Sequence, residues 1–321
     1  MNLLRMGLLL IFSLVLLIPE TSIASYMAEV IVKVIDEDGK PVDEANVEIC
    51  FYGGCLTKDA IFGHTDSKGL FTKMAESKDG TVGLGVQKEG FYTSVFHHQF
   101  YNTKFGKWQP WDKEITIVLR KKINPVPMYV RNRYFEIPAH GKEIGFDLMK
   151  ADWVIPYGQG LHSDFIMRVD RQYKNIDNFD ATLTLTFTNK YDGIQVVKDD
   201  RGGPFRLGSR SVYNLPRTAP DAGYQTKLVK RISRGNYGIR NDRFDDNNYI
   251  FRVRSEVNEE GKLQRAMYGK ILGEIEFAAL SNNGEIGMHY YLNPDFTRNL
   301  EYDPRKNLFK SLPSDEGVGQ P

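Results

Sequence analysis

The sequence lacks an excess of charge of either sign. Its 321 residues contain 42 Lys and Arg against 41 Asp and Glu, which leaves a net charge of +1. Phosphate binding needs a clear cationic excess, so we expect no nucleic-acid partner. With 41% hydrophobic residues, the chain is long enough for two modest hydrophobic cores.

Long hydrophobic runs are also scarce. One apolar run, residues 6–18, follows Arg5, and it is shorter than the roughly 20 residues that span a bilayer. Ser22 and Ala24 are small residues at the spacing of a signal-peptidase site. The sequence therefore predicts a signal peptide over residues 1–24, cut after Ala24, and a secreted or periplasmic protein with no stable membrane span after cleavage. A retained membrane anchor is the alternative.

Cysteine is nearly absent. Cys50 and Cys55, in "CFYGGC", are the two cysteines, and an oxidising compartment favours their pairing. Alternation with Ile49 and Phe51 turns Cys50 toward the outer face of its strand, and Gly53 begins a turn that can bring Cys55 opposite. We predict a disulfide. A metal site is the rival, but two cysteines supply half of the usual ligands.

Helical periodicity is missing as well, and short alternating segments separated by turn residues take its place. This pattern predicts an all-β protein that begins with a β-sandwich. Strands are expected at residues 30–35, 45–51, 69–74, 81–87 and 114–120.

Four blocks in order, "VKVIDEDGKPVDEANVEI", "TDSKGLF", "VQKEGFYTS" and "EITIVLRKK", resemble the carboxypeptidase regulatory-like domain. The resemblance covers about residues 29–122, and it departs from the family at the Cys loop and at an insertion over residues 96–113. It implies a transthyretin-like, seven-stranded Greek-key sandwich. It implies no activity, because such domains have no catalytic residues of their own.

The remaining chain is expected to form a second all-β unit. Residues 26–122 would be the first sandwich, and residues 123–145 a connector whose prolines block regular pairing. Residues 146–309 would form a second β-sandwich or jelly-roll-like domain, for which "ATLTLTFTN" gives the strongest alternation, with Leu183, Leu185 and Phe187 inward. Residues 310–321 are polar and rich in Pro and Gly, which predicts a disordered tail.

Motifs for catalysis are incomplete. His140 and Glu143 have the H-x-x-E spacing of zinc carboxypeptidases, and His289 could be a third ligand. However, the domain order is reversed relative to that enzyme family, and the second half lacks helical periodicity. Ser163 lies beside His162 and Asp164, but neighbouring residues in a strand point to opposite faces and cannot converge as a triad. We assign no catalytic residue, no metal ligand and no cofactor.

An aromatic loop is the stronger candidate site. "YNTKFGKWQPW" places Tyr101, Phe105, Trp108 and Trp111 in one insertion, where exposed rings could stack on a sugar or enter a partner's pocket. The alternative is that the rings close the end of the sandwich. His97 and His98 nearby could bind a metal or be solvated.

A basic stretch follows in the second half. Ten Lys and Arg stand against Asp221 and Asp242 between residues 201 and 243. Such a stretch could meet an acidic polysaccharide or a phospholipid surface, or its cations could pair with acids elsewhere. Residues 241–249 could hold calcium, although they lack the ordered Gly and Glu of an EF-hand loop.

These observations favour an exported, non-catalytic protein of binding or assembly at the cell envelope, with a glycan or an envelope protein as its partner. A zinc-dependent hydrolase and a purely structural envelope protein are the alternatives. The sequence leaves the oligomeric state open.

Overall fold

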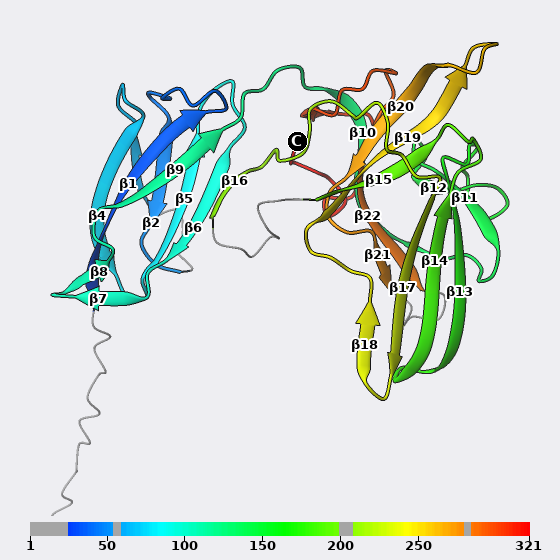
Figure 1. Ribbon diagram of the computed structural model, residues 1–321, viewed down its shortest axis with the longest axis horizontal. Helices are drawn as coiled ribbons and strands as arrows, with labels where there is room; N and C mark the ends of the chain where they lie inside the picture. The colour runs from blue at the N-terminus through cyan, green and yellow to red at the C-terminus, as the bar shows by residue number, and fades with distance from the viewer. Residues whose placement is uncertain (1–24, 54–58, 199–207, 279–283) are drawn as a thin grey trace, which may run out of the picture.

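The computed structural model describes residues 25–53, 59–198, 208–278 and 284–321. The regular elements named in these ranges are β-strands, which form four sheets in two β-sandwiches lying side by side (Figure 1). The prediction of an all-β protein with two successive sandwiches is confirmed. The predicted signal peptide, residues 1–24, lies outside the described residues. Within the described ranges, no helix has the length and apolar character needed to cross a membrane.

The first sandwich consists of two sheets that share one core. One sheet has the order β4-β1-β8-β7, with β9 also paired to β1, and the other has the order β16-β6-β5-β2-β3. The strands of the first sheet are β1 (Tyr26–Asp36), β4 (Leu70–Ser77), β7 (Asn102–Lys104), β8 (Lys107–Gln109) and β9 (Lys113–Leu119). Those of the second are β2 (Asn46–Cys50), β3 (Ile61–His64), β5 (Thr81–Gln87), β6 (Ser94–Gln99) and β16 (Gly208–Ser211).

Alternation places the core of this sandwich as predicted. Val30, Val32 and Val34 of β1 are fully buried, while the residues between them are half-buried on the other face. Gly69 is required at the turn before β4, because its φ is +74° and a Cβ there would lie 2.4 Å from the carbonyl oxygen of Val34. The five predicted strand segments correspond to β1, β2, β4, β5 and β9.

The second sandwich also pairs two sheets, of seven and six strands. The seven-stranded sheet has the order β15-β19-β20-β22-β10-β23, with β21 also paired to β22, and the six-stranded sheet has the order β12-β11-β13-β14-β17-β18. The first comprises β10 (Val126–Glu136), β15 (Gly193–Lys198), β19 (Asn247–Val257), β20 (Leu263–Ile271), β21 (Glu276–Ala278), β22 (Glu285–Asn293) and β23 (Tyr302–Asn307). The second comprises β11 (Glu143–Asp147), β12 (Asp152–Trp153), β13 (Phe165–Asn175), β14 (Asn178–Thr186), β17 (Lys227–Gly235) and β18 (Gly238–Asn241).

The "ATLTLTFTN" segment lies as its pattern predicts. Leu183 and Leu185 of β14 are buried in the core between the two sheets, and Phe187 packs against that core while half-buried. The intervening threonines of β14 lie on the opposite face. This outer face is therefore a polar surface of the six-stranded sheet.

The predicted connector, residues 123–145, is wrong in its central part. Residues 126–136 form β10, which lies inside the seven-stranded sheet between β22 and β23. The register with β23 shifts between Val126 and Met128, so Pro127 lies where pairing is irregular and its missing N–H is tolerated. Met128 and Val130 are fully buried, which explains why this segment cannot be a free linker.

Strand β16 crosses the predicted boundary between the units. It comes from residues 208–211, within the predicted second domain, but it pairs antiparallel with β6 from Gly208↔His97 to Ser211↔Ser94. Figure 1 shows β16 beside β6 at the edge of the first sandwich. The second half of the chain therefore completes a sheet of the first sandwich.

The C-terminal tail corrects another expectation. Residues 310–321 form no strand, as their composition predicts, but they pack against the second sandwich. Glu316 pairs with Arg131 and its carbonyl accepts the Asn132 N–H at 3.3 Å, while Val318 packs on the cluster around Met128. Hydrogen bonds and the ion pairs of Glu316 with Arg131 and Arg133 hold a segment whose polar composition alone would predict disorder.

Candidate functional site

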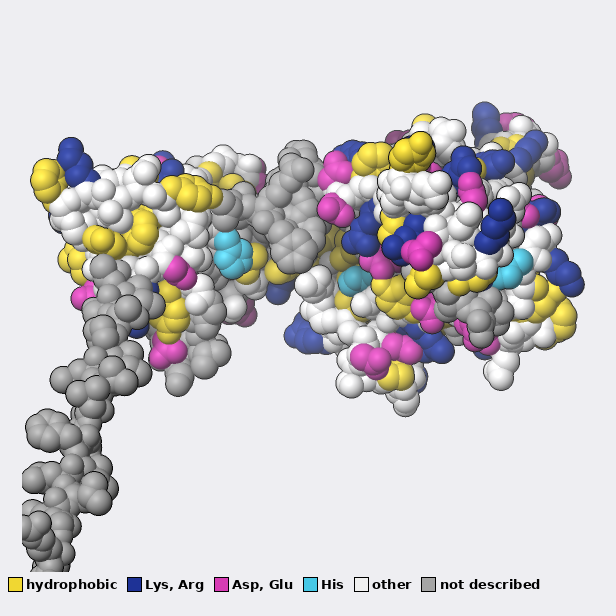
Figure 2. Space-filling model, turned by 90° about the horizontal axis from the view of Figure 1, so that it is seen from below, with side chains coloured by type: hydrophobic (Ala, Val, Ile, Leu, Met, Phe, Trp, Pro, Cys, Tyr) yellow, Lys and Arg dark blue, Asp and Glu magenta, His cyan; other side chains and the backbone are white. Residues whose placement is uncertain are grey.

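Two of the four predicted binding rings are exposed, Phe105 at the tip of the β7–β8 hairpin and Tyr101 just before β7. Lys104 pairs with Lys107 and encloses a two-residue loop, Phe105 and Gly106, whose φ angles of +49° and +74° suit the tight turn favoured between two twisted strands. The Phe105 side chain is 91% exposed and Tyr101 is 76% exposed. Figure 2 shows hydrophobic atoms next to a Lys or Arg side chain at this outer end of the first sandwich.

Trp108 anchors the same hairpin. It is half-buried, and its indole Nε1 donates to the carbonyl oxygen of Ser77 at 3.0 Å. Its ring centroid lies 5.6 Å from that of Tyr26, and a Cβ on Gly80 would come within 3.0 Å of the ring. Trp108 therefore packs at the base of the hairpin, which agrees with the alternative in which rings close the end of the sandwich.

Within the part of the chain that the structure describes, the Trp111 side chain is neither as exposed as that of Phe105 nor hydrogen-bonded into the base of the hairpin as that of Trp108 is. It is half-buried, and the Lys107 ammonium sits 3.8 Å from its ring centroid. The structure therefore does not bring Tyr101, Phe105, Trp108 and Trp111 into one exposed aromatic surface. It divides them into two exposed rings and two rings that support the hairpin.

The predicted disulfide involves one described residue. Cys50 ends β2 and is half-buried on the face opposite Ile49, as alternation predicts. Cys55 lies outside the described residues, so the pairing stays a prediction.

The candidate zinc ligands occupy separate elements. His140 lies in the turn between β10 and β11, Glu143 is exposed at the start of β11, and His289 lies on β22. Burial, together with the nearby Lys270 charge, lowers the pKa of His289 to about 4, and its Nε2 lies 2.9 Å from the Tyr291 hydroxyl oxygen. Within the described ranges, no three His, Cys, Asp or Glu residues group as metal ligands, which also covers residues 241–249.

His97 and His98 face opposite ways on β6. His97 is exposed, whereas His98 is half-buried with its ring centroid 4.6 Å from that of Phe100. Successive strand residues point to opposite faces, so these two imidazoles are poorly placed to share a metal. Burial lowers the pKa of His98.

Asp164 belongs to a buried ion cluster. Arg254 donates to both of its carboxylate oxygens, at 2.7 and 2.9 Å, and to Asp147 at 3.1 Å. Burial raises the pKa of Asp164 against the effect of Arg254. Both Asp164 oxygens are thus held by the Arg254 guanidinium. His162, Ser163 and Asp164 precede β13 and lie outside any strand, so strand alternation, the ground of the sequence argument against a triad, does not describe these residues.

Much of the basic stretch is paired. Part of it, residues 201–207, lies outside the described residues. Besides Arg217, four cations of the described part pair with acids: Lys230 with Glu274, Arg231 with Asp180, Arg234 with Asp177 and Arg243 with both Asp245 and Glu276. For these residues, the structure therefore agrees with pairing to acids of the same chain rather than with a free surface for an acidic ligand.

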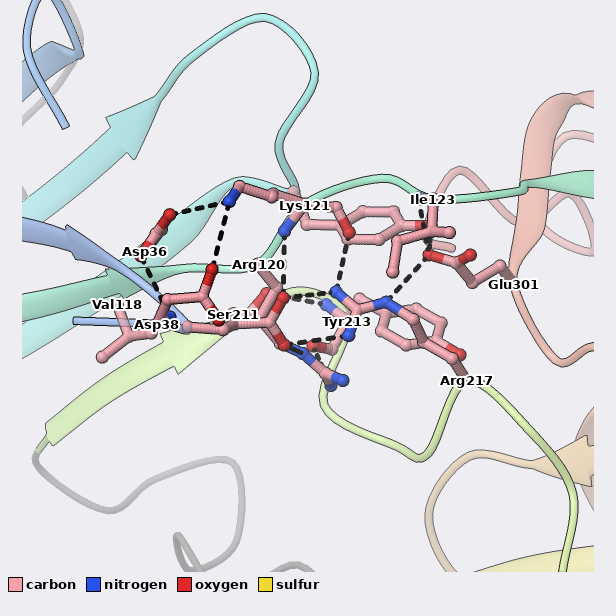
Figure 3. A network of polar contacts seen from close by, with 12 residues as sticks. Asp36, Asp38, Val118, Arg120, Lys121, Ile123, Ser211, Tyr213, Arg217 and Glu301 are labelled. Atoms are coloured by element: carbon pink, nitrogen blue, oxygen red, sulfur yellow. Dashed lines mark hydrogen bonds and ion pairs between the residues drawn. The ribbon is translucent and has the colours of Figure 1, made fainter. Parts of the chain in front are cut away.

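Arg217, from the same stretch, joins the two sandwiches (Figure 3). Its guanidinium donates to both oxygens of Glu37 at 2.9 and 2.6 Å, while its Nε donates to Glu301 at 3.2 Å. Glu37 follows β1 of the first sandwich, and Glu301 precedes β23 of the second. Hydrogen bonds from Arg217, with Arg120 adding another, lower the pKa of Glu37 to about 2.

A buried lysine lies beside this junction. Lys270 of β20 is 1% exposed, and its ammonium sits 4.5 Å from the ring centroid of Tyr213 and 4.6 Å from that of Tyr291. Tyr213 in turn stacks on Tyr92 of the first sandwich at 4.8 Å. Burial lowers the pKa of Lys270 to about 7, although the charge of Glu301 opposes the shift.

Sequence reasoning missed the junction because its partners are remote along the chain. Glu37 and Arg217 are 180 positions apart, and no periodic pattern links them. The one available signal was the excess of cations between residues 201 and 243 over local acids, which implied partners elsewhere. The sequence could not say which acids these were.

The strand register also aligns a row of polar side chains across the six-stranded sheet, which no sequence motif predicted. Gln172 of β13 pairs with Asp180 of β14, Asp180 with Ser233 of β17, and Ser233 with Arg240 of β18. Directly opposed residues in a sheet point to the same face, so four polar side chains line up across the outer face of the six-stranded sheet. They line a cavity of about 450 Å³.

Comparisons with known proteins yield no assignment. No family model matches the chain, and no curated protein matches it, so the resemblance to the carboxypeptidase regulatory-like domain stays a prediction. Among solved structures, a 3-chlorocatechol 1,2-dioxygenase from Rhodococcus opacus is 12% identical over 32% of this chain, with a TM-score of 0.25. The match covers 62% of the dioxygenase, less than two thirds of its length.

Two other structures match over a longer range. The shaft pilin SpaA from Lactobacillus rhamnosus is 10% identical over 82% of this chain and 94% of its own, with a TM-score of 0.22. A putative membrane-associated protein of unknown function from Bacteroides fragilis is 11% identical over 84% of this chain and 97% of its own, with a TM-score of 0.20. Likeness at this level supports no statement about what the chain does.

Proposed function

We propose that the chain is an exported, non-catalytic protein of binding or assembly at the cell envelope, and that its first sandwich contacts a partner protein through the β7–β8 hairpin. The observation that carries the proposal is the Phe105 ring, 91% exposed at the tip of a firmly anchored hairpin. Aromatic side chains that fill a partner's pocket dominate many protein interfaces.

The hairpin itself gains nothing evident from a phenylalanine at this position. A bulky residue with positive φ is a conformational outlier, and Asn is the residue that two-residue hairpin loops prefer there. The contact that the ring makes is with the neighbouring Lys104 ammonium, 5.3 Å from its centroid. A role in binding explains an unfavourable, exposed ring at a tight turn.

The packing of Trp108 favours a protein over a glycan at this hairpin. Stacking on a sugar needs an open ring face, and the half-buried Trp108 ring stacks on Phe100 and makes a T-shaped contact with Tyr26. Phe105 projects as a single ring, with Lys104 and Lys107 beside it. One projecting ring suits insertion into an apolar pocket.

Replacing Phe105 with Asn separates folding from binding. Asn tolerates positive φ, so Phe105→Asn should leave the free energy of unfolding unchanged or raise it by up to about 1 kcal/mol, while retention on isolated cell envelopes should fall at least tenfold. Co-sedimentation of the purified protein with envelopes measures retention, and chemical denaturation measures stability. Phe62→Thr is the matched control, because Phe62 is 61% exposed on β3 and should not affect retention.

Treating the envelopes identifies the class of partner. Protease digestion should abolish retention and periodate oxidation of glycans should not. Retention that survives protease, or that Phe105→Asn leaves intact, would contradict the proposal.

A further inference from the structure

The cavity on the outer face of the six-stranded sheet has the chemistry of a sugar site. Its polar row offers an amide from Gln172, a hydroxyl from Ser233 and a guanidinium from Arg240, beside the carboxylate of Asp180. Sugar hydroxyls both donate and accept hydrogen bonds, so they match a mixed set of planar donors and acceptors. A volume of about 450 Å³ lies in the usual range for small-ligand sites, roughly 300–1,000 Å³.

An aromatic ring stands at the rim of the same cavity. Tyr237, in the loop between β17 and β18, lines the cavity and is 90% exposed. A tyrosine ring offers an apolar face and a polar tip, which suits the C–H face of a sugar with its hydroxyl groups around it. The ring therefore lies where a saccharide bound to the polar row would extend.

The charges around the cavity favour an acidic ligand. Arg240 and Lys174 both line it, and neither has an acidic partner within the described part of the chain. Asp180 is already engaged by Arg231 outside the cavity, and Arg234 pairs with Asp177 at 3.1 Å. Two cations are thus left for a ligand carboxylate. Figure 2 shows Lys and Arg intermingled with Asp and Glu on the underside of the second sandwich.

From these features we propose that the cavity between the β13–β14 and β17–β18 hairpins binds an acidic saccharide. Arg240 and Lys174 pair with the ligand carboxylates, Gln172 and Ser233 hydrogen-bond ring hydroxyls, and Tyr237 packs on one sugar face. This site lies on the second sandwich and is independent of the Phe105 contact on the first.

The probe is a tetramer of galacturonic acid, with maltotetraose as a neutral oligosaccharide of the same length. Calorimetric titration of the full-length protein at low salt should give saturable binding of the acidic tetramer, weakened by added salt because of screening. Maltotetraose should bind at least tenfold more weakly.

Variants test the site residue by residue. Arg240→Gln and Lys174→Gln should each weaken binding of the acidic tetramer about fivefold to twentyfold, and Tyr237→Ser should weaken it as well. Lys262→Gln removes an exposed cation in the β19–β20 turn, outside the cavity lining, and should have no effect. Phe105→Asn should also leave saccharide binding intact, so failure of this site and failure of the protein contact are distinguishable.

Absence of saturable binding at millimolar tetramer would overturn the proposal. So would equal binding of maltotetraose, or binding that Arg240→Gln and Lys174→Gln leave unchanged. Circular dichroism of each variant, unchanged from the parent, ensures that a loss of binding is a loss of the site.

Discussion

At the scale of single residues, the burial of Lys270 carries a cost in free energy. An ammonium that is 1% exposed has lost its hydration, and two tyrosine rings replace only part of it. The groups near it are the Tyr213 and Tyr291 rings and the His289 imidazole, with Glu301 as the opposing charge and Arg120 as a like charge. The rings keep it in place at the junction without giving it a carboxylate partner.

Stability should therefore rise with pH above neutrality. The pKa of Lys270 is about 7 in the folded protein and roughly 10.4 when unfolded. Between these values the unfolded chain binds the extra proton, so the free energy of unfolding increases with pH, by at most about 1.4 kcal/mol per pH unit. Denaturant unfolding from pH 7 to pH 9.5, below most tyrosine ionisation, measures this slope.

Lys270→Met is expected to remove the slope and to raise the free energy of unfolding at pH 7, because an apolar chain of similar length suits the ring environment. Lys262→Met, at an exposed position, should do neither. A variant with the parent's slope would show that another group titrates.

At the scale of elements, β16 shows how a short strand ties two sandwiches together. Its pairing with β6 is extended by the Val212 N–H, which donates to the Thr93 carbonyl oxygen at 2.8 Å. Beyond it, Tyr213 and Leu215 are buried at the junction. A change that removes the Val212 N–H should therefore affect the first sandwich, although Val212 lies in the second half of the chain.

Val212→Pro is expected to loosen β6. Proline removes the N–H that bonds to Thr93, and loss of a hydrogen bond that leaves a partner unsatisfied costs about 1–3 kcal/mol. Hydrogen exchange in β6 should accelerate, and light scattering should reveal association through the uncovered strand edge. Val212→Thr keeps the N–H and the branched side chain and should preserve protection in β6.

The elements that sequence predicted are those with local signals. Alternation alone located β1 and β14, since their buried valines and leucines are period-two patterns that need no partner to be recognised. β10 was missed because Pro125 and Pro127 suggested a linker, and tertiary burial of Met128 overrode that signal. β16 was missed because its partner strand lies more than a hundred residues earlier.

The candidate sites follow the same division. Composition could locate the loop that holds Phe105 and Trp108, but exposure depends on what the rest of the sandwich leaves uncovered, so the two rings could not be separated. The row from Gln172 to Arg240 depends on the register of four strands. A slip of one residue in any of them would send its side chain to the other face.

At the scale of the whole molecule, a network of charges fixes the junction of the sandwiches. Arg217 holds Glu37 from one sandwich and Glu301 from the other, and Glu301 also accepts the Tyr92 hydroxyl at 3.2 Å. Glu37 is the residue of this network whose protonation can be followed by lowering the pH, because its pKa in the folded protein is about 2.

Acid should weaken this junction over a defined range. The pKa of Glu37 is depressed in the folded state, so its contribution is complete above the unfolded value of about 4.3 and disappears as pH falls toward 2. Glu37→Gln should lower the free energy of unfolding by about 2 kcal/mol at pH 6, and its difference from the parent should shrink between pH 4.5 and pH 2. Glu256→Gln, in an exposed pair with Arg265, should show a smaller difference at pH 6.

The position of β16 also bears on the order in which the protein matures. A polypeptide delivered with its N-terminus first presents β6 to its surroundings long before residues 208–211 arrive to cover it. During that interval the unpaired edge of β6 can form hydrogen bonds with strands of neighbouring nascent chains. The first sandwich therefore cannot complete its sheet until residues 208–211 have emerged. A ribosome or translocon that stalls before that point would leave an intermediate that is prone to aggregate.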